Sequence, residues 1–154
     1  MHSLFMPTPL GLLAIRASEH HVQRIEFVDD EDTTPAAEPL LIEAKNQLQQ
    51  YFDGQRRAFT LPLAAQGTAF QQTVWQALTH IDYGQTASYA QIADAISKPK
   101  AVRAVGAANG RNPLAIVVPC HRIIGKDGSL TGYAGGLTRK AWLLELEQRH
   151  LSPD

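Results

Sequence analysis

Residues 88–110, SYAQIADAISKPKAVRAVGAANG, contain two helical patterns separated by a proline. Ser88 followed three residues later by Gln91 is a capping-box pair, which is typical of the first turn of a helix. Pro99 ends that helix, and a second helical pattern begins at Lys100. Two short helices joined by such a turn predict a helix-turn-helix, a motif that can place its second helix against DNA.

The second of these helices is unusually rich in small residues. They are Ala101, Ala104, Gly106, Ala107 and Ala108. Such a helix can approach a surface closely, but it offers few long polar side chains to read base edges in the major groove. It fits the narrower minor groove better, with Arg103 as a probe. Close packing of one helix on another explains the same composition, so this segment alone leaves both interpretations open.

The N-terminal part of the chain predicts a small α/β lobe. Residues 11–18 and 21–28 alternate between apolar and polar side chains around a short polar turn, which predicts a β-hairpin. Apolar residues recur at helical spacing over 40–52, and Gly54 ends that helix.

The remainder of the chain predicts a mainly helical domain. Residues 57–67 read as an extended linker, so we expect an α/β lobe with its linker over 1–66 and a second domain over 67–154. Within the second domain, the apolar run LAIVV at 114–118 predicts a buried strand. The fold class is therefore α/β, with a helical C-terminal domain that carries the helix-turn-helix and the segment PCHR.

Composition limits the class of protein. The chain has 154 residues, of which 44% are hydrophobic and 19% charged, as is ordinary for a globular protein. Its first residues lack the basic and apolar regions of a signal peptide, and no apolar run approaches the ~20 residues of a membrane span. Cys120 is the only cysteine and cannot form an internal disulfide. A free thiol fits a reducing compartment, so we expect a cytoplasmic protein with no membrane partner.

Charge is unevenly distributed along the chain. The net charge is −1, yet residues 95–126 contain six basic residues and no acidic one. The basic residues are Lys98, Lys100, Arg103, Arg111, Arg122 and Lys126. This separation indicates an anionic partner for the C-terminal domain. Chance clustering on a solvated surface explains it equally well, and charge alone does not decide.

Cys120 lies between a proline and a histidine in VVPCHRIIG. A cysteine reacts as its thiolate, which requires a base or a positive charge nearby. His121 is adjacent, but neighbouring side chains of an extended segment point to opposite faces, so a turn or a bridging water is required. A carboxylate on the last helix, Glu145 or Glu147, could orient the histidine. A buried and inert thiol is the structural alternative.

Residues 109–147, NGRNPLAIVVPCHRIIGKDGSLTGYAGGLTRKAWLLELE, resemble the active-site block of O6-alkylguanine-DNA alkyltransferases, also called methylated-DNA–protein-cysteine methyltransferases. The resemblance extends upstream through GTAFQQTVWQAL, IDYGQTASYAQIA and AVRAVGAANGRNP to residue 67. TPLGLLAI and QQYFDG resemble the N-terminal lobe of that family. PCHR combined with RAVG, GYAGG and LLELE is highly specific. The resemblance implies an enzyme for DNA repair that transfers an alkyl group from the O6 atom of guanine to its own cysteine, irreversibly and once.

The resemblance also implies roles for individual residues. Cys120 matches the alkyl acceptor, and His121 matches the histidine that takes the thiol proton through water. Glu147 matches the glutamate that orients this histidine. Asn112 matches the asparagine that braces the turn before the cysteine, and Tyr89 matches the tyrosine that helps to protonate the leaving guanine.

A second set of residues matches the family's contacts with DNA. Arg103 falls on the arginine that fills the space left when the damaged nucleotide flips out. Its companions on the DNA-binding surface are Tyr89, Lys100, Ala101, Ala104 and Arg111. The pocket for the lesion comprises Ile123, Tyr133, Ala134 and Gly135. Ala134 stands where some relatives carry serine, so a hydroxyl contact to the lesion is absent here.

We expect double-stranded DNA containing O6-alkylguanine as the partner, a monomeric protein, and no cofactor or metal. Some relatives carry a structural zinc, but Cys120 is already committed. His2, His20 and His21 do not form a closed zinc site by themselves.

Three other functions stay open. A non-enzymatic sensor of alkylated DNA shares the fold but lacks the acceptor cysteine, which Cys120 argues against. A helix-turn-helix regulator with a redox-active thiol would carry more base-reading side chains. A cysteine hydrolase requires an oxyanion hole, which nothing in the sequence indicates.

Overall fold

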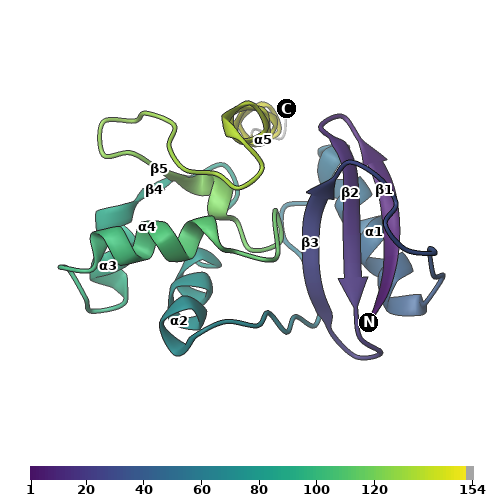
Figure 1. Cartoon of the computed structure of the whole chain (residues 1–154). Helices are drawn as coiled ribbons and strands as arrows, with labels where there is room; N and C mark the ends of the chain where they lie inside the picture. The colour runs from purple at the N-terminus through teal and green to yellow at the C-terminus, as the bar shows by residue number, and fades with distance from the viewer. Residues whose placement is uncertain (152–154) are drawn as a thin grey trace. The chain divides into compact units, whose positions relative to one another are not determined.

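A computed structural model describes residues 1–151, which form two compact units, Met1–Gln66 and the chain from Gly67 on (Figure 1). The first unit contains β1 (His2–Thr8), β2 (Gly11–Ala17), β3 (Val22–Val28) and α1 (Pro39–Phe52). The second contains α2 (Ala69–Leu78), β4 (Ala87–Ser88), α3 (Tyr89–Ala95), α4 (Val102–Gly110), the 3₁₀ helix η1 (Cys120–Arg122), β5 (Ile123–Ile124) and α5 (Leu137–Arg149). The predicted combination of an α/β lobe and a mainly helical part is confirmed.

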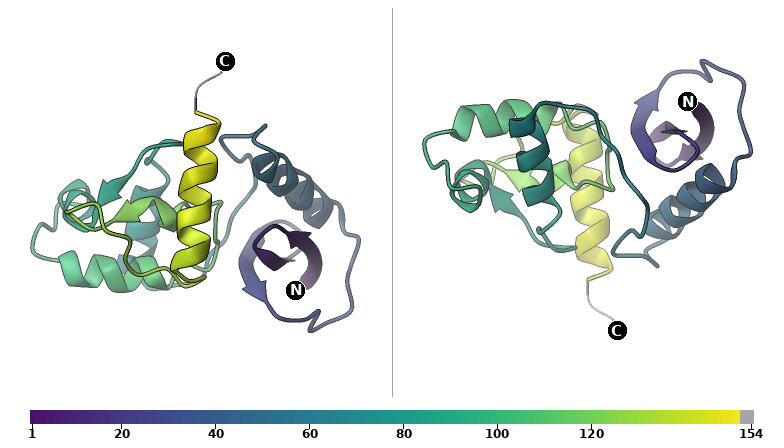
Figure 2. Two further views of the ribbon diagram at one scale, coloured as in Figure 1. Left: turned by 90° about the horizontal axis from the view of Figure 1, so that it is seen from above. Right: turned by 90° about the horizontal axis from the view of Figure 1, so that it is seen from below.

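The first unit is an antiparallel sheet in the order β1-β2-β3, with α1 packed against it (Figure 2). The predicted hairpin is formed by β2 and β3, which pair as far as Ala17 and Val22 next to the turn. β1 is a strand that the sequence analysis did not predict, and it contains Pro7, which lacks the N–H that a central strand needs. Pro7 is tolerated since β1 lies at the edge of the sheet.

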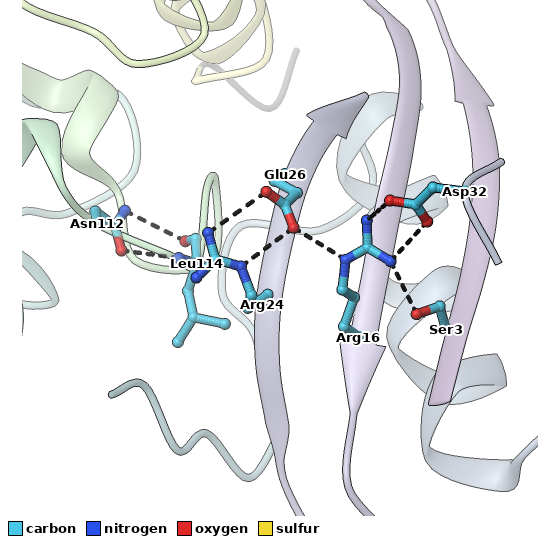
Figure 3. A network of polar contacts seen from close by, with 7 residues as sticks. All are labelled: Ser3, Arg16, Arg24, Glu26, Asp32, Asn112 and Leu114. Carbon is cyan, nitrogen blue, oxygen red and sulfur yellow. Dashed lines mark hydrogen bonds and ion pairs between the residues drawn. The ribbon is translucent and has the colours of Figure 1, made fainter. Parts of the chain in front are cut away.

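A buried arginine ties the acidic loop of the first unit to the sheet (Figure 3). Arg16 on β2 is 8% exposed, and its guanidinium donates to Glu26 at 2.9 Å and to both oxygens of Asp32 at 3.0 and 2.7 Å. It also donates to Ser3 Oγ at 3.0 Å. Hydrogen bonding to Arg16 lowers the pKa of Asp32, so this carboxylate is ionised at neutral pH. At least part of the acidic run at 29–32 therefore has a structural role.

In the second unit, α4 packs against both α2 and α3 (Figure 1). The predicted capping box of Ser88 and Gln91 is confirmed at the start of α3. The second helix of the motif begins at Val102 instead of Lys100, because the amide of Ala101 closes a turn by donating to the carbonyl of Lys98 at 2.9 Å. Over residues 1–151, no helix combines the length and apolar character needed to cross a bilayer.

Candidate active site

The apolar run at 114–118 is a turn, so the predicted strand is wrong. The Asn112 side chain explains the difference. Its Nδ2 donates to the Val118 carbonyl at 2.8 Å. Its Oδ1 accepts from the Leu114 amide at 3.0 Å (Figure 3). Ile116 has a φ of 74°, which costs a β-branched residue about 1–3 kcal/mol. One amide side chain thus holds a strained turn immediately before the cysteine.

Cys120 and His121 lie in η1, so the turn that their pairing requires is present. The amide of Arg122 donates to the Pro119 carbonyl at 3.0 Å and closes it. In a 3₁₀ helix neighbouring side chains are about 120° apart, instead of opposite as in a strand. Cys120 is 4% exposed and His121 is 0% exposed. The thiol and the imidazole are both removed from bulk water.

Glu147 on α5 is the centre of a buried hydrogen-bond network. His121 Nε2 lies 2.6 Å from one carboxylate oxygen of Glu147. Arg122 donates to both oxygens, at 2.9 and 3.1 Å, and the amide of Gly84 donates at 3.0 Å. Glu147 is 0% exposed, whereas Glu145 is exposed. The structure therefore brings only one of the two candidate glutamates to the histidine.

These contacts fix the protonation of the pair. Burial alone would raise the pKa of Glu147, but bonds and charges from His121 and Arg122 outweigh it and lower the pKa to about 2. Burial lowers the pKa of His121, which the Glu147 carboxylate offsets only in part, so the imidazole is neutral. Since the carboxylate can only accept, the Nε2–H donates to it, and Nδ1 carries the lone pair. Nδ1 is buried and bonds to no group in residues 1–151.

The Cys120 thiol is protonated at rest. Burial raises its pKa to about 11, against the opposing effects of a hydrogen bond from Asn112 and the charge of Lys140. Formation of the reactive thiolate therefore requires a base at the site. His121 is a neutral, oriented imidazole with an unused nitrogen, which suits that task.

Tyr89 reaches the site through a two-stranded parallel pairing. β4 pairs with β5, which places the first residue of α3 beside the chain that follows η1. The Tyr89 hydroxyl lies 2.8 Å from Thr131 Oγ1. A Cβ at Gly106 would lie 3.6 Å from the Tyr89 ring, and one at Gly132 would lie 3.3 Å from its hydroxyl. The glycines at 106 and 132 thus allow the backbone to lie close to the Tyr89 side chain on both sides.

The residues predicted for the lesion pocket differ in exposure. Ile123 is fully buried, Ala134 is exposed, and Tyr133 is half-buried, with a phenol oxygen that bonds to nothing in the described chain. A Cβ at Gly135 would lie 2.7 Å from the Tyr133 ring, so a side chain at this position would displace that ring. Burial raises the pKa of Tyr133, which keeps its hydroxyl neutral.

The helix-turn-helix presents its basic residues to solvent. Lys100, Arg103, Ala104 and Arg111 are exposed, and Ala101 is half-buried at the N-cap of α4. Within the part of the chain that the structure describes, Lys100, Arg103 and Arg111 form no ion pair or side-chain hydrogen bond. Their charges remain available to an external anion, and they do not belong to the network around Cys120.

Family models divide the chain in two. Residues 69–149 match 6-O-methylguanine DNA methyltransferase, DNA binding domain, and residues 1–65 match its ribonuclease-like domain. The chain belongs to the 6-O-methylguanine DNA methyltransferase family. The resemblance drawn from PCHR and its companion segments is confirmed.

Relatives of this methyltransferase family are similar over nearly the whole chain. The constitutive methylated-DNA–protein-cysteine methyltransferase of Bacillus subtilis is 54% identical over an alignment 151 positions long, which covers 92% of each chain. That of Mycobacterium leprae is 45% identical, over 98% of this chain and 94% of its own. A Mycobacterium tuberculosis OGT structure in complex with DNA has a TM-score of 0.90 and 44% identity, over 97% and 94% of the two chains.

Four residues of this methyltransferase-family site were missed by the sequence analysis. Arg122 was noted only as a basic residue, yet it holds Glu147. Asn109 Nδ2 donates to the Cys120 carbonyl at 3.4 Å, and Thr131 contacts Tyr89. Lys140 is fully buried on α5. All four lie within the family segments, Asn109 in RAVGAANG, Arg122 in PCHR, Thr131 in SLTGYAGG and Lys140 in GGLTRK, but no local rule singles them out.

Proposed function

We propose that this chain repairs DNA by transferring an alkyl group from the O6 atom of guanine to Sγ of Cys120, in one irreversible turnover. The observation that carries the proposal is the neutral His121, oriented by an ionised Glu147, beside the only cysteine of the chain. A relative 54% identical that is named for methyl transfer from DNA to a protein cysteine supports the same reaction.

In the proposed reaction, the proton of the Cys120 thiol passes to His121 Nδ1, directly or through a water. The thiolate attacks the alkyl carbon, an S–C bond forms, and the C–O6 bond breaks with its electron pair going to guanine. Tyr89 donates its hydroxyl proton to the leaving base, which lowers the barrier. His121 returns its extra proton to water, and Tyr89 regains one from water. The thioether cannot regenerate the thiol, so each molecule reacts once.

DNA is bound by the helix-turn-helix in this proposal. The target atom lies inside a duplex, so the nucleotide must be extruded at a cost of a few kcal/mol. Arg103 on α4 fills the space that the nucleotide leaves, and Tyr133, Ala134, Gly135 and Ile123 receive the base. Lys100 and Arg111 bind phosphates, which makes binding tolerant of sequence, as a repair protein requires. We further propose that the protein acts as a monomer in the cytoplasm, where its lone thiol stays reduced.

Intact-protein mass spectrometry tests this function directly. Incubation with duplex DNA containing O6-methylguanine is expected to add about 14 Da, one methyl replacing one hydrogen on the nucleophile. Peptide mapping should locate the adduct at Cys120, with never more than one per chain. Lesion binding without an adduct would contradict the proposal and favour a non-enzymatic sensor.

Replacing Arg103 with alanine is expected to slow repair of duplex DNA but not the reaction with free O6-benzylguanine. Because the free base needs no extrusion, only the duplex reaction depends on filling the space in the helix. A loss of about 1.4 kcal/mol from the extrusion step slows that reaction about tenfold. Single-turnover rates with both substrates measure the effect.

Arg111→Ala is the matched control, since it removes an exposed arginine at the C-cap of α4. It should weaken binding to DNA without changing the rate at saturating DNA. Equal losses with duplex and free base in Arg103→Ala would contradict the extrusion role.

A further inference from the structure

The Tyr89 hydroxyl makes all of its described polar contacts with one residue, Thr131. Its oxygen lies 2.8 Å from Thr131 Oγ1 and 3.4 Å from the Thr131 carbonyl oxygen. Within residues 1–151, the Thr131 hydroxyl has no other hydrogen-bond partner. Both residues are half-buried. The acid of the proposed reaction therefore has a single partner, which belongs to the loop between β5 and α5.

The lengths of the two contacts decide which group donates. A phenol has one proton, so Tyr89 can donate to only one acceptor at a time. The carbonyl of Thr131 already accepts from Lys140 Nζ, and its distance of 3.4 Å from the Tyr89 oxygen is long for an O–H···O bond. The short contact joins the two hydroxyls. When Tyr89 turns its proton toward guanine, the Thr131 hydroxyl is the donor within hydrogen-bond distance of the phenol oxygen.

The backbone fixes both members of this hydroxyl pair. Tyr89 follows the N-cap of α3, and the pairing of β4 with β5 holds that end of the helix. On the other side, the bond from Lys140 on α5 to the Thr131 carbonyl anchors the loop. Gly132 has a φ of 42°, and a Cβ there would lie 3.3 Å from the Tyr89 hydroxyl oxygen. The pair is thus preorganised, which reduces the entropy lost when it acts.

We propose that Thr131 is a positioning residue for Tyr89, and that its hydroxyl donates to the phenol oxygen while Tyr89 gives its proton to the leaving guanine. As that proton leaves, negative charge develops on the phenol oxygen, and a hydrogen bond to the charged form stabilises it. The Thr131 proton stays on Oγ1 throughout, and Tyr89 regains its own proton from water. The inference rests on the proposed function, because it assigns a partner to the acid of that reaction.

Thr131→Val and Thr131→Ser separate the hydroxyl from the shape of the side chain. Valine keeps the branched shape of threonine but cannot donate, whereas serine keeps the hydroxyl. Single-turnover transfer from saturating duplex DNA containing O6-methylguanine should slow about tenfold in Thr131→Val, the lower end of what a hydrogen bond to a charged group contributes. Thr131→Ser should restore most of the rate. Thr73→Val is the matched control and should match the native protein, since it removes an exposed hydroxyl that bonds only within α2.

Two further measurements separate this role from a structural effect of the loop. Tyr89→Phe removes the acid, so adding Thr131→Val to it should cause no further loss, whereas independent effects would multiply. Methyl iodide forms the same thioether at Cys120, but iodide leaves without a proton. Native protein and Thr131→Val should therefore react with methyl iodide at equal rates, measured by peptide mapping of the only cysteine.

Three results would overturn the inference: an unchanged rate of transfer from DNA in Thr131→Val, losses that multiply in the double variant, or an equal loss with methyl iodide. If the valine variant does not fold, Thr131→Ala removes the hydroxyl with less bulk and replaces it in the same comparisons. Failure of the proposed function looks different, because the native protein would then accept a methyl group from methyl iodide but not from the lesion in DNA.

Discussion

Replacing Cys120 with serine is expected to abolish alkyl transfer and to leave DNA binding nearly unchanged. A serine hydroxyl is a far weaker acid than a thiol, so His121 cannot generate a comparable nucleophile from it. The substitution is conservative in volume and lies in a buried 3₁₀ helix, whereas the basic residues proposed to bind DNA are exposed around α4. Mass spectrometry of the protein and fluorescence anisotropy of a labelled lesion duplex measure the two properties separately.

Arg103→Ala provides the comparison for Cys120→Ser. It retains the thiol and should still react with free O6-benzylguanine, which Cys120→Ser should not. Residual methylation of Cys120→Ser would show that another residue accepts the alkyl group. A loss of DNA affinity as large as the loss of transfer would show that the acceptor and the DNA-binding surface are not separate.

Replacing Glu147 with glutamine is expected to reduce both stability and the rate of transfer. The variant leaves the guanidinium of Arg122 buried without an anion, which costs about 3–5 kcal/mol. The glutamine amide can also donate to His121 Nε2, which moves the imidazole proton to Nδ1 and removes the base. A wrong histidine tautomer lowers the rate of a serine protease about 10⁴-fold, so we expect a loss of about 10²–10⁴-fold here.

The effect of Glu147→Gln on stability should depend on pH. The pKa of Glu147 is lowered to about 2 from an ordinary value of 4.5, so its stabilising charge is fully present above pH 4.5 and lost as pH falls toward 2. Urea unfolding should therefore show the largest difference between native protein and variant at neutral pH, with convergence in acid. Glu145→Gln, two residues away and exposed, is the control and should match the native protein throughout. A constant difference at all pH values would contradict this assignment of the charge.

Local signals in the sequence predicted most elements but not all. The capping box at Ser88 is confirmed because its bonds join residues three apart. The run at 114–118 has the composition of a strand, yet Asn112 supplies side-chain partners to its backbone in place of a neighbouring strand. Side-chain competition of this kind is not visible in apolar patterning.

The site was predictable where family motifs reach it and not where burial decides. Helical periodicity on α5 did not separate Glu145 from Glu147. The family motif indicated Glu147, and the packing of α5 on η1 shows that Glu147 meets His121. Lys140 escaped notice because a lysine on an amphipathic helix is ordinarily on the solvent face. Its Nζ donates to the carbonyl of Thr131, a residue from a loop whose course the sequence does not reveal.

Because the chain has a single cysteine, the state of that thiol across a population of molecules records how much repair has taken place. If each chain reacts once and cannot be restored, the fraction of molecules whose thiol still reacts with a thiol reagent after denaturation counts the lesions already removed. No other thiol contributes a background to that count. The capacity of a cell to repair such damage is then set by how many unreacted chains it holds, and replenishing it requires new synthesis.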